Sequence, residues 1–407
     1  MAGHTSIADA SKLAGGFYVP QVRISAQGQE FPQQVVRDIV EITYKDKLEE
    51  IDSCEIVVNN WDATQGCFKY IGSEELDENG KPAGSAANNP NAQLWTLFDP
   101  CTKNVTLELG YAPGPLTKMI VGNFVTYEPN FPASGPPVLS VRMLNLLHKL
   151  RNEKKDETYT AANVKPLKDS LIAKYIDSKK RLPVPIHVPE GQDGKEPELT
   201  YVVQKSQYDI DFLWQRARTR GYELRINDEG EVEFSPSLNK DTPVYRLTWG
   251  QSLIDFKPTL TTGNQYKSVT VRGFDRATQK TIEEKVDLKE IGKLNKDLHY
   301  LLDQCDPRDE TVIDKPMFTK QQAKEYARST FTDQLKRMVK ATGTTIGLPQ
   351  LRAGSRVLIG SAPGSKLTLG TRLSGTYFVT ATTHVFNSSG YTTKFEARRE
   401  DEDYKPQ

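Results

Sequence analysis

The chain has 407 residues, and its 53 basic and 53 acidic side chains cancel to no formal net charge at pH 7. A balanced chain lacks the basic excess of a dedicated nucleic-acid-binding protein, and no apolar run approaches the ~18 residues of a membrane-spanning helix. The length predicts two or three domains, and 37% hydrophobic with 26% charged residues is the composition of a soluble globular protein. The first residues lack the basic start and apolar block of a secretory signal, so we expect assembly in the cytoplasm.

The cysteines and sequons carry little functional signal. No two cysteines form C-x-x-C and their spacing is wide, so we predict free thiols and no disulfide framework. The four are Cys54, Cys67, Cys101 and Cys305. Since nothing indicates a glycosylating compartment, the sequons at Asn104 and Asn387 are expected to stay unmodified.

The first third of the chain is predicted to be rich in β-strands. Strands are expected over 17–25, 40–45 and 54–58, where apolar residues alternate with polar ones in the period of a half-buried strand. A polar stretch over 72–93 follows, rich in Gly, Asn, Pro and charge. It is long for a loop in a compact domain, which predicts a disordered insertion or an interaction arm. Strands resume at Leu94 and run to Met143.

The middle of the chain is predicted to be a small α+β domain. Helices are expected over 144–156 and 167–180, followed by a proline-rich connector over 183–198. A third helix is expected from Ser206, a predicted N-cap, to Arg220, with Gly221 ending it. Strands over 222–226 and 231–234 should then form a hairpin.

The last third returns to strands around one helix. A strand is expected over 268–274, and Thr319, with Gln322 three residues later, predicts the start of a helix over 320–340. Residues 355–399 then repeat the order of features in residues 105–143: a strand ending in Gly, an Ala-Pro-Gly turn, a strand with an aromatic residue and Val-Thr, and a last strand. The acidic residues 400–407 are expected to be a frayed end.

The repeated segments predict either a duplicated barrel ending or two barrels that share only common hairpin features. If they are copies, Gly122 of GNFVT and Gly375 of GTYFVT should lie at equivalent strand starts, and Val125 should match Val379. The second segment has one additional residue between Gly and Val-Thr. We therefore expect a β-bulge there, because a one-residue slip would exchange the two faces of the strand.

The sequence contains no recognisable catalytic or metal-binding motif. G-x-S-x-G, H-E-x-x-H and the phosphate-binding G-x-x-x-x-G-K-[ST] are all absent. The five histidines are too scattered to suggest a metal pair: His4, His148, His187, His299 and His384. The four tryptophans lie within or beside apolar strands and helices, which favours packing over a ligand platform: Trp61, Trp95, Trp214 and Trp249. We predict no catalytic, cofactor-binding or metal-binding residues.

Segments spread along the chain carry a family resemblance. FLWQRARTRGYELRI, LTTGNQYKSVTVRGFDRATQK, GTTIGLPQLRAGSRVLIG and LSGTYFVTATTHVFNSSGYTTKFEARR together resemble the phage late control protein D family, the baseplate hub proteins of contractile tails. The chain is also similar to the hub part of type six secretion spike proteins and to hubs of extracellular contractile injection systems. The run FDPCTKNVTLELGY looks like the start of the same family's first barrel, so the resemblance covers about 17–399.

The resemblance implies a mainly β fold with two tandem β-barrel domains and small α+β domains, assembled as a homotrimer. The expected domains are a first barrel over 15–143 with the polar arm 72–93, an α+β middle domain over 144–250, a second barrel over 251–399 with an inserted helix 320–340, and a tail over 400–407. The implied partners are further copies of the chain, the tail tube protein, a separate spike protein and other baseplate proteins, without a cofactor, membrane anchor or specific nucleic acid.

The implied function is that of a non-enzymatic hub that adapts a six-fold tail tube to a three-fold spike. A trimer whose subunit carries two similar barrels would present six similar modules to the tube. Two alternatives remain open at this stage. One is a cell-wall hydrolase whose acids converge only in the folded chain, and the other is a carbohydrate-binding β-barrel protein.

Overall fold

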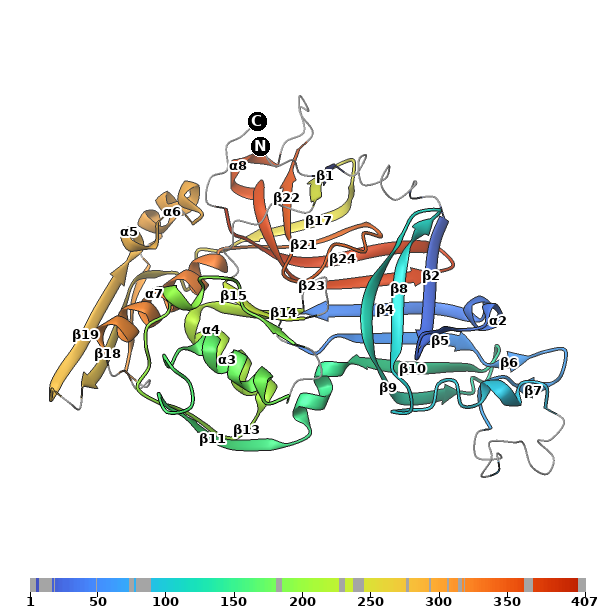
Figure 1. Ribbon diagram of the computed structural model, residues 1–407. Coiled ribbons are helices and arrows are strands. Elements are labelled where there is room, and N and C mark those ends of the chain that lie inside the picture. Colours follow the sequence, from blue (N-terminus) through green and yellow to red (C-terminus); the bar gives the residue numbers. More distant parts are fainter. Residues whose placement is uncertain are drawn as a thin grey trace.

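The computed structural model describes residues 5–6, 17, 19–48, 50–72, 77, 89–180, 185–226, 231–236, 245–275, 278–292, 294–305, 307–313, 317, 319–361 and 369–401. Most of the predicted arm over 72–93, the turn at 362–364 and residues 402–407 lie outside the described residues. The described chain forms two β-rich bodies side by side and two smaller α+β units next to them (Figure 1). Within the described part, no helix combines the length and hydropathy needed to span a bilayer.

The first β-body is an antiparallel sheet of six strands from the first third of the chain. Its order is β2 (Val19–Ala26), β8 (Val105–Ala112), β9 (Leu116–Asn130), β10 (Val138–Asn145), β5 (Ser53–Asn59) and β4 (Ile39–Lys47). A short strand, β3 (Gln29–Glu30), and helix α2 (Gln33–Arg37) follow β2. The predicted alternation is confirmed for β5 and for β4 from Ile42 onward, because Tyr44 and Ile56 are fully buried in the core of this body. It is wrong for Val40, which is 48% exposed and is the additional residue at a register shift in β4.

The second β-body is built mainly from the last third of the chain. Its order is β16 (Tyr245–Thr248), β22 (Arg356–Gly360), β23 (Gly375–Asn387), β24 (Gly390–Arg399), β21 (Val339–Ile346) and β17 (Leu253–Leu260). All neighbours are antiparallel except β16 and β22, and the two-residue strand β1 (Thr5–Ser6) adds to β16 in parallel. Helix α8 (Gly370–Leu373) precedes β23.

The two β-bodies share one continuous sheet. Residues 381–387 of β23 pair antiparallel with residues 41–47 of β4, so that 14 strands belong to the same sheet. The earlier part of β23 pairs on that same side with β22 of its own body. The predicted fold class, mainly β with small α+β parts, is confirmed, and β23 is the strand through which the two halves are connected.

The two repeated segments have the same strand order. β8, β9 and β10 form an antiparallel meander, and so do β22, β23 and β24. The expectation that Gly122 and Gly375 begin equivalent strands is wrong: Gly375 begins β23, whereas Gly122 lies inside β9, where a Cβ would come within 2.0 Å of the Leu144 carbonyl oxygen.

The second segment has a bulge, but it lies after Val379 and not between Gly375 and Val379 as predicted, and the first segment has a bulge too. Register shifts leave Val125 as the additional residue of β9 and Thr380 as the additional residue of β23. Matched by their bulges, the segments pair Val125 with Thr380, so the predicted match of Val125 with Val379 is one residue out of register. The Thr380 carbonyl accepts a hydrogen bond from the Leu48 amide of the first β-body, at 3.2 Å.

The middle unit combines short sheets with two helices. Its strands are β11 (Lys154–Tyr159) paired with β13 (Val202–Tyr208), and β12 (Ile186–His187) paired with the hairpin of β14 (Tyr222–Ile226) and β15 (Val232–Pro236). Its helices are α3 (Asp169–Ser178) and α4 (Asp209–Arg220), with 3-10 turns η4 (Leu146–Arg151) and η5 (Asp193–Lys195). The predicted hairpin and the helix within 167–180 are confirmed.

Two local predictions in the middle unit are wrong. The helix expected over 144–156 is only the turn η4, and Lys154 begins a strand, because pairing with β13 outweighs the helical spacing of the leucines. Ser206 does not cap α4: it lies within β13 in a left-handed conformation (φ 48°), and its amide donates to the Asp156 carboxylate at 2.9 Å. The prediction that Gly221 ends α4 is confirmed, since Gly221 adopts the left-handed conformation of a helix C-cap, with φ 68°.

The inserted unit lies in the chain between β17 and β21. It is a three-stranded sheet of β18 (Tyr266–Asp275), β19 (Lys280–Asp287) and β20 (Arg308–Val312), with short helices α5 (Leu288–Ile291) and α6 (His299–Gln304) and the 3-10 turn η6 (Lys296–Leu298). Helix α7 (Lys320–Lys336) packs on β18 and β19. The Thr319 hydroxyl accepts from the Gln322 amide at 3.1 Å, so the predicted cap is confirmed, and the helix ends before residue 340.

We predict that Leu213→Ala destabilises the protein by about 2–5 kcal/mol, because a buried leucine loses its transfer free energy and leaves a cavity. Leu213 is 1% exposed in the core of the middle unit. Urea unfolding measures the change. The control is Ile254→Ala on β17, where 65% of the side chain is exposed and a small effect is expected. Equal losses in both variants would mean that the α4 face is not a core.

Candidate functional site

The described histidines lie in different elements: His148 in η4, His187 in β12, His299 in α6 and His384 in β23. His384 is buried, and its Nδ1 and Nε2 lie 2.8 Å from the Tyr391 hydroxyl and 3.1 Å from the Leu351 carbonyl oxygen. Since the carbonyl can only accept, Nε2 donates to it. Burial, together with the charge of Arg352, lowers the pKa of His384 to about 3, so the ring stays neutral. Within the described residues no three His, Cys, Asp or Glu side chains come together as metal ligands, and His4 lies outside them.

A buried charged cluster lies where the two β-bodies meet. We call Tyr44, Asp46, Asp52, Arg352 and His384 the seam cluster. The Arg352 Nε donates to an Asp46 oxygen at 2.7 Å, and another of its nitrogens contacts the Tyr44 hydroxyl. The same Asp46 oxygen accepts from the Ala353 amide at 3.0 Å. A single carboxylate of β4 therefore fixes the loop that enters β22.

The second carboxyl of the seam cluster has a different electrostatic environment. The Tyr44 hydroxyl donates to Asp52 at 3.3 Å. Burial and the neighbouring Asp46 carboxylate raise the pKa of Asp52 well above its usual range, although Arg352 opposes the shift. Arg352 thus pairs with Asp46 and also acts through its charge on Asp52, which accepts the hydrogen bond from Tyr44. A buried ion pair of this kind requires a fixed geometry, because removing one partner leaves the other charge buried without compensation.

A second charged cluster connects β24 to both smaller units. The Arg398 Nε donates to Glu400 at 2.7 Å, and another of its nitrogens contacts Glu223 of β14. Lys336, at the end of α7, lies 3.7 Å from Glu400. Burial raises the pKa of Glu400, but the positive charges of Lys336 and Arg398 outweigh this effect and hold the pKa below its usual value. The end of β24 is therefore the point at which the middle unit, the inserted unit and the second β-body meet.

The middle and inserted units also meet directly, along α4 and α7. Asp169, which is buried, accepts from Arg216 and Arg220 at 2.5 Å each, and Arg220 reaches on to Glu325 of α7 at 2.7 Å. The helices approach closely, since a Cβ on Gly221 would lie 2.9 Å from the Ser329 hydroxyl. Hollows of about 530, 360 and 330 Å³ follow this contact.

Among the described pockets, acids that the hydrolase alternative could use line a small one beside the seam cluster, with Asp46, Glu50 and Asp52, and also the smallest of these three hollows. Its lining includes Glu196, Glu325 and Asp333, and burial raises the pKa of each carboxyl. Cations oppose the shift in every case, with Arg220 near Glu196 and Glu325, and Lys336 near Asp333. Carboxyls held beside cations in this way are typical of a charged interface between units.

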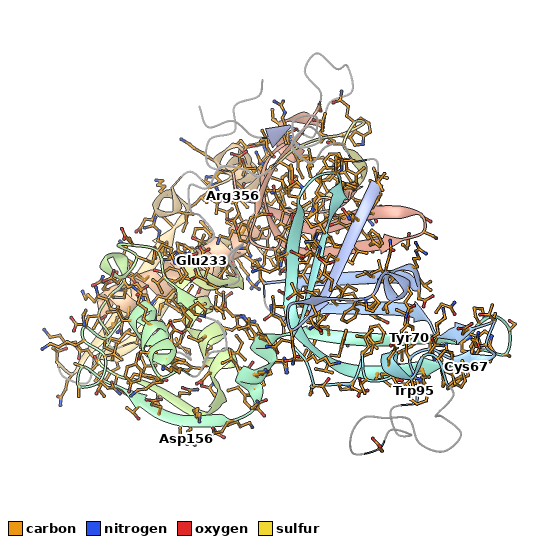
Figure 2. All side chains as sticks on the ribbon, turned by 45° about the vertical axis from the view of Figure 1, so that its right-hand side comes forward. Cys67, Tyr70, Trp95, Asp156, Glu233 and Arg356 are labelled. Carbon is orange, nitrogen blue, oxygen red and sulfur yellow. The ribbon has the colours of Figure 1, made fainter. Side chains whose placement is uncertain are left out.

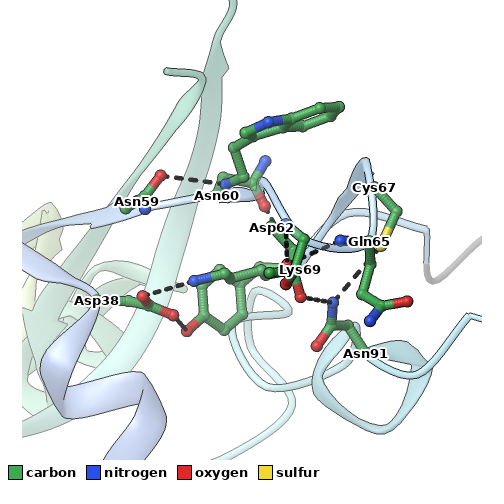
Figure 3. A network of polar contacts seen from close by, with 11 residues as sticks. Asp38, Asn59, Asn60, Asp62, Gln65, Cys67, Lys69 and Asn91 are labelled. Carbon is green, nitrogen blue, oxygen red and sulfur yellow. Dashed lines mark hydrogen bonds and ion pairs between the residues drawn. The ribbon is translucent and has the colours of Figure 1, made fainter. Parts of the chain in front are cut away.

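A polar network fixes the base of the predicted arm (Figure 3). Asp62 accepts from the Thr64 and Gln65 amides at 3.0 and 3.1 Å, which shapes the hairpin of β6 (Trp61–Asp62) and β7 (Cys67–Phe68). Lys69 and the Tyr70 hydroxyl both donate to Asp38, at 2.7 Å each.

The network continues to the other end of the arm. The Asn91 side chain donates to Asp62 at 3.4 Å, just before the 3-10 turn η3 (Ala92–Leu94). Gly72 has φ 136°, and a Cβ there would lie 2.6 Å from the Trp95 ring, so the chain leaves the first β-body against a tryptophan. Figure 2 places Cys67, Tyr70 and Trp95 at one end of the molecule, away from Asp156 of the middle unit.

The tryptophans and cysteines have structural surroundings. Trp95 and Trp214 are buried, as predicted, whereas Trp61 is half-buried and Trp249 is exposed. The four cysteines are free thiols, of which Cys54 is buried. Sequence reasoning did not identify the seam cluster, because Tyr44, Asp46 and His384 lie in strands, Asp52 and Arg352 lie in loops, and no motif joins them.

Comparison with known proteins agrees with this architecture. A family model described as "Alg8 N-terminal domain" matches residues 96–388, well over half of the chain, and the chain belongs to that family. No curated protein sequence matches the chain.

Solved structures share the fold over almost the whole chain. The 43 kDa tail protein of prophage MuSo2 from Shewanella oneidensis is 13% identical with a TM-score of 0.61, over 93% of this chain and 98% of that one. A tail protein from Neisseria meningitidis MC58 is 12% identical with a TM-score of 0.60, over 94% and 97%. An E. coli component of the type VI secretion system is 12% identical with a TM-score of 0.55, over 94% and 79%. The chain therefore has the fold of phage tail proteins and of a type VI secretion component.

We predict that Arg352→Met lowers the free energy of unfolding by about 3–5 kcal/mol, because it leaves the Asp46 carboxylate buried without its cation. Urea unfolding at neutral pH measures the loss. The control is Arg272→Met, which removes an exposed ion pair with Glu283 and should cost less than about 1 kcal/mol. A small loss in both variants would show that the two β-bodies do not depend on the seam cluster.

The raised pKa of Asp52 predicts a pH dependence of stability. Because the folded protein favours the protonated carboxyl, the stabilising effect of Asp52 is complete below its unfolded pKa of about 3.9 and is lost as pH rises through the raised folded value. Asp52→Asn keeps the side chain neutral at every pH. The stability of this variant relative to the natural protein should therefore increase as the pH rises from 4 to 8 in urea unfolding series. A difference that stays constant over this range would contradict the assignment.

Proposed function

We propose that the protein is the structural baseplate hub of a contractile tail or injection particle. In this proposal it is a homotrimer of the late control protein D type that adapts the six-fold tail tube to a three-fold spike. It assembles in the cytoplasm of the host or producing cell and becomes part of the particle's baseplate. Its partners are the tube protein, a separate spike protein and other baseplate proteins.

The observation that carries the proposal is the pair of β-bodies within one chain. Each contains six strands in its main sheet, and each contains an antiparallel meander with a bulge in the middle strand. Three copies of such a chain contain six related β-bodies, which suits a ring that contacts a six-fold tube while keeping three-fold symmetry. The tail-protein fold over almost the whole chain supports the same reading.

The domain division belongs to the same proposal. We retain a first barrel over 15–143, a middle domain over 144–250 and a second barrel over 251–399. The seam cluster supports a rigid angle between the two barrels, because Arg352 and Asp46 come from different β-bodies and are both largely buried. A ring made of six modules requires such a fixed angle.

The proposal excludes turnover of cell-wall polymers. The carboxyls of Glu196, Glu325 and Asp333 line one hollow and give the hydrolase alternative a physical basis. A muramidase assay on the purified protein tests it. Turnover that disappears in Glu196→Gln and persists in Glu30→Gln, an exposed control, would replace the structural role with a catalytic one.

We predict three copies of the chain in the complex with its spike protein. The two proteins are mixed at high concentration and analysed by light scattering coupled to size exclusion. The measured mass should be that of a complex with three copies of the chain. Electron microscopy of the same ring should show the two β-bodies of one chain about one-sixth of a turn apart around the axis. A stable dimer or tetramer contradicts the trimer, and β-bodies that face opposite ends of the ring contradict the six-module arrangement.

A further inference from the structure

The two β-bodies share one strand topology. In chain order, the main strands of the first body are β2, β4, β5, β8, β9 and β10, and those of the second are β16, β17, β21, β22, β23 and β24. In both sheets the spatial order of these strands is first, fourth, fifth, sixth, third and second. One direction differs, because β2 is antiparallel to β8 whereas β16 is parallel to β22. The match makes β4 the counterpart of β17, and β9 the counterpart of β23.

The bulges support this match residue by residue. β9 and β23 each carry one, at Val125 and Thr380. β4 and β17 also carry one each, and in both strands the additional residue is the second, Val40 in β4 and Ile254 in β17. Both are apolar and exposed, at 48% and 65%. Counting from the bulges therefore gives each residue along these four strands a counterpart in the other body.

The contact between the two bodies joins strands that are not counterparts. The second half of β23 pairs with β4, on the side where its first half pairs with β22. In the first body, β8 pairs with residues 116–122 of β9. No described strand of this chain holds the place beside residues 128–130 of β9 that β4 holds beside β23, and among the described strands β17 pairs with β21 alone. The chain thus contains one β4–β23 contact and both strands for a second one, β17 and β9.

An exposed phenylalanine lies where such a second contact would bury it. Phe131 directly follows β9, and although its ring contacts Phe68 it remains 58% exposed. Counted from the bulges, its counterpart is Phe386 of β23, which pairs with Ile42 of β4 and packs against the core of the first β-body. The counterpart of Ile42 is Phe256 of β17, which is half-buried against the core of the second β-body. The match therefore places Phe131 against Phe256 of a neighbouring copy.

We propose that β17 of one copy lies against residues 128–131 of the next copy, at the end of β9, and that this contact repeats around the ring. The inference rests on the proposed trimer and names the strands that join its copies. In the register of the β4–β23 contact, Asn130 faces Lys257 of the next copy. Tyr127 lies outside the proposed contact, because its hydroxyl donates to the Tyr70 carbonyl at the base of the arm, at 2.8 Å. Three copies then close through three contacts within chains and three between chains.

The contact between copies is weaker than its counterpart within the chain. Leu260 stands where β4 has Asp46, so the buried ion pair with Arg352 has no counterpart. Pro258 of β17 and Pro129 of β9 face each other in this register, and neither has an amide that could donate a hydrogen bond. Proline on a strand edge also limits pairing with wrong partners. The copies should therefore separate under conditions in which each chain stays folded.

Disulfide cross-linking in the complex with the spike protein tests the register. Asn130→Cys and Lys257→Cys are placed on separate full-length chains in which the exposed Cys101 and Cys305 are replaced by serine. After mild oxidation, the mixed complex should give two disulfide-linked chains on a non-reducing gel, because facing residues of neighbouring antiparallel strands lie within reach of a disulfide. Both substitutions on one chain should give a product of three linked chains.

Two control pairs calibrate the cross-linking. Thr43→Cys with Val385→Cys, on one chain, is the counterpart pair in the β4–β23 contact and should form its disulfide without linking chains. Asn130→Cys with Thr281→Cys, an exposed position of β19 in the inserted unit, should not link chains.

Phe131→Asp tests the packing of the phenylalanine. A charge at this position should raise the chain concentration at which half of the complex has formed at least about tenfold, as measured by sedimentation velocity. The control is Phe274→Asp on β18, where the side chain is similarly exposed, at 52%, and where assembly should change less than about twofold. Circular dichroism confirms that both variants are folded.

Two outcomes separate this inference from the proposed function. A complex that does not contain three copies of the chain overturns the trimer, and the inference with it. A trimer that assembles normally with Phe131→Asp and gives no link between Asn130→Cys and Lys257→Cys, while the control pair in the β4–β23 contact closes, keeps the trimer and overturns the inference.

Discussion

The pairing of β4 with β23 is the interaction on which the rest of the architecture depends. It joins a strand from the beginning of the chain to one near its end, and the buried Arg352–Asp46 ion pair lies beside it. Without this seam the two β-bodies would be independent sheets with two exposed edges. With it, the Thr380 carbonyl at the bulge accepts a hydrogen bond from Leu48 of the first β-body. Backbone and side-chain contacts therefore both fix the angle between the two β-bodies.

Ion pairs attach the middle and inserted units to the second β-body. The middle unit reaches the second β-body through Glu223 and Arg398, and the inserted unit reaches it through Lys336 and Glu400. These contacts converge at the end of β24, while Asp169 and its arginines connect the two smaller units to each other.

Local signals in the sequence were sufficient for much of the fold, and the failures have physical causes. The alternation in β4 and β5 and the Thr319 cap depend on neighbours within a few residues, so they could be predicted. Ser206 has the residue type of a cap, but pairing of β13 with β11 draws its backbone into the strand. Arg352 and Asp46 are 306 positions apart and belong to no motif, so only the folded chain brings them together.

The order in which the strands are synthesised has a consequence for folding. The β4 edge is made early, yet its partner β23 follows more than 300 residues later, so the contact that closes the double body has a very large sequence separation. Contacts of this kind form slowly, because a long loop must be closed before they contribute any stability. Until then, β4 is an open strand edge on a growing polypeptide, and such edges favour pairing with the wrong chain. Among the residues of β4 that later pair with β23 are Glu41 and Lys45, and charged side chains on an edge strand are a common protection against aggregation during this interval.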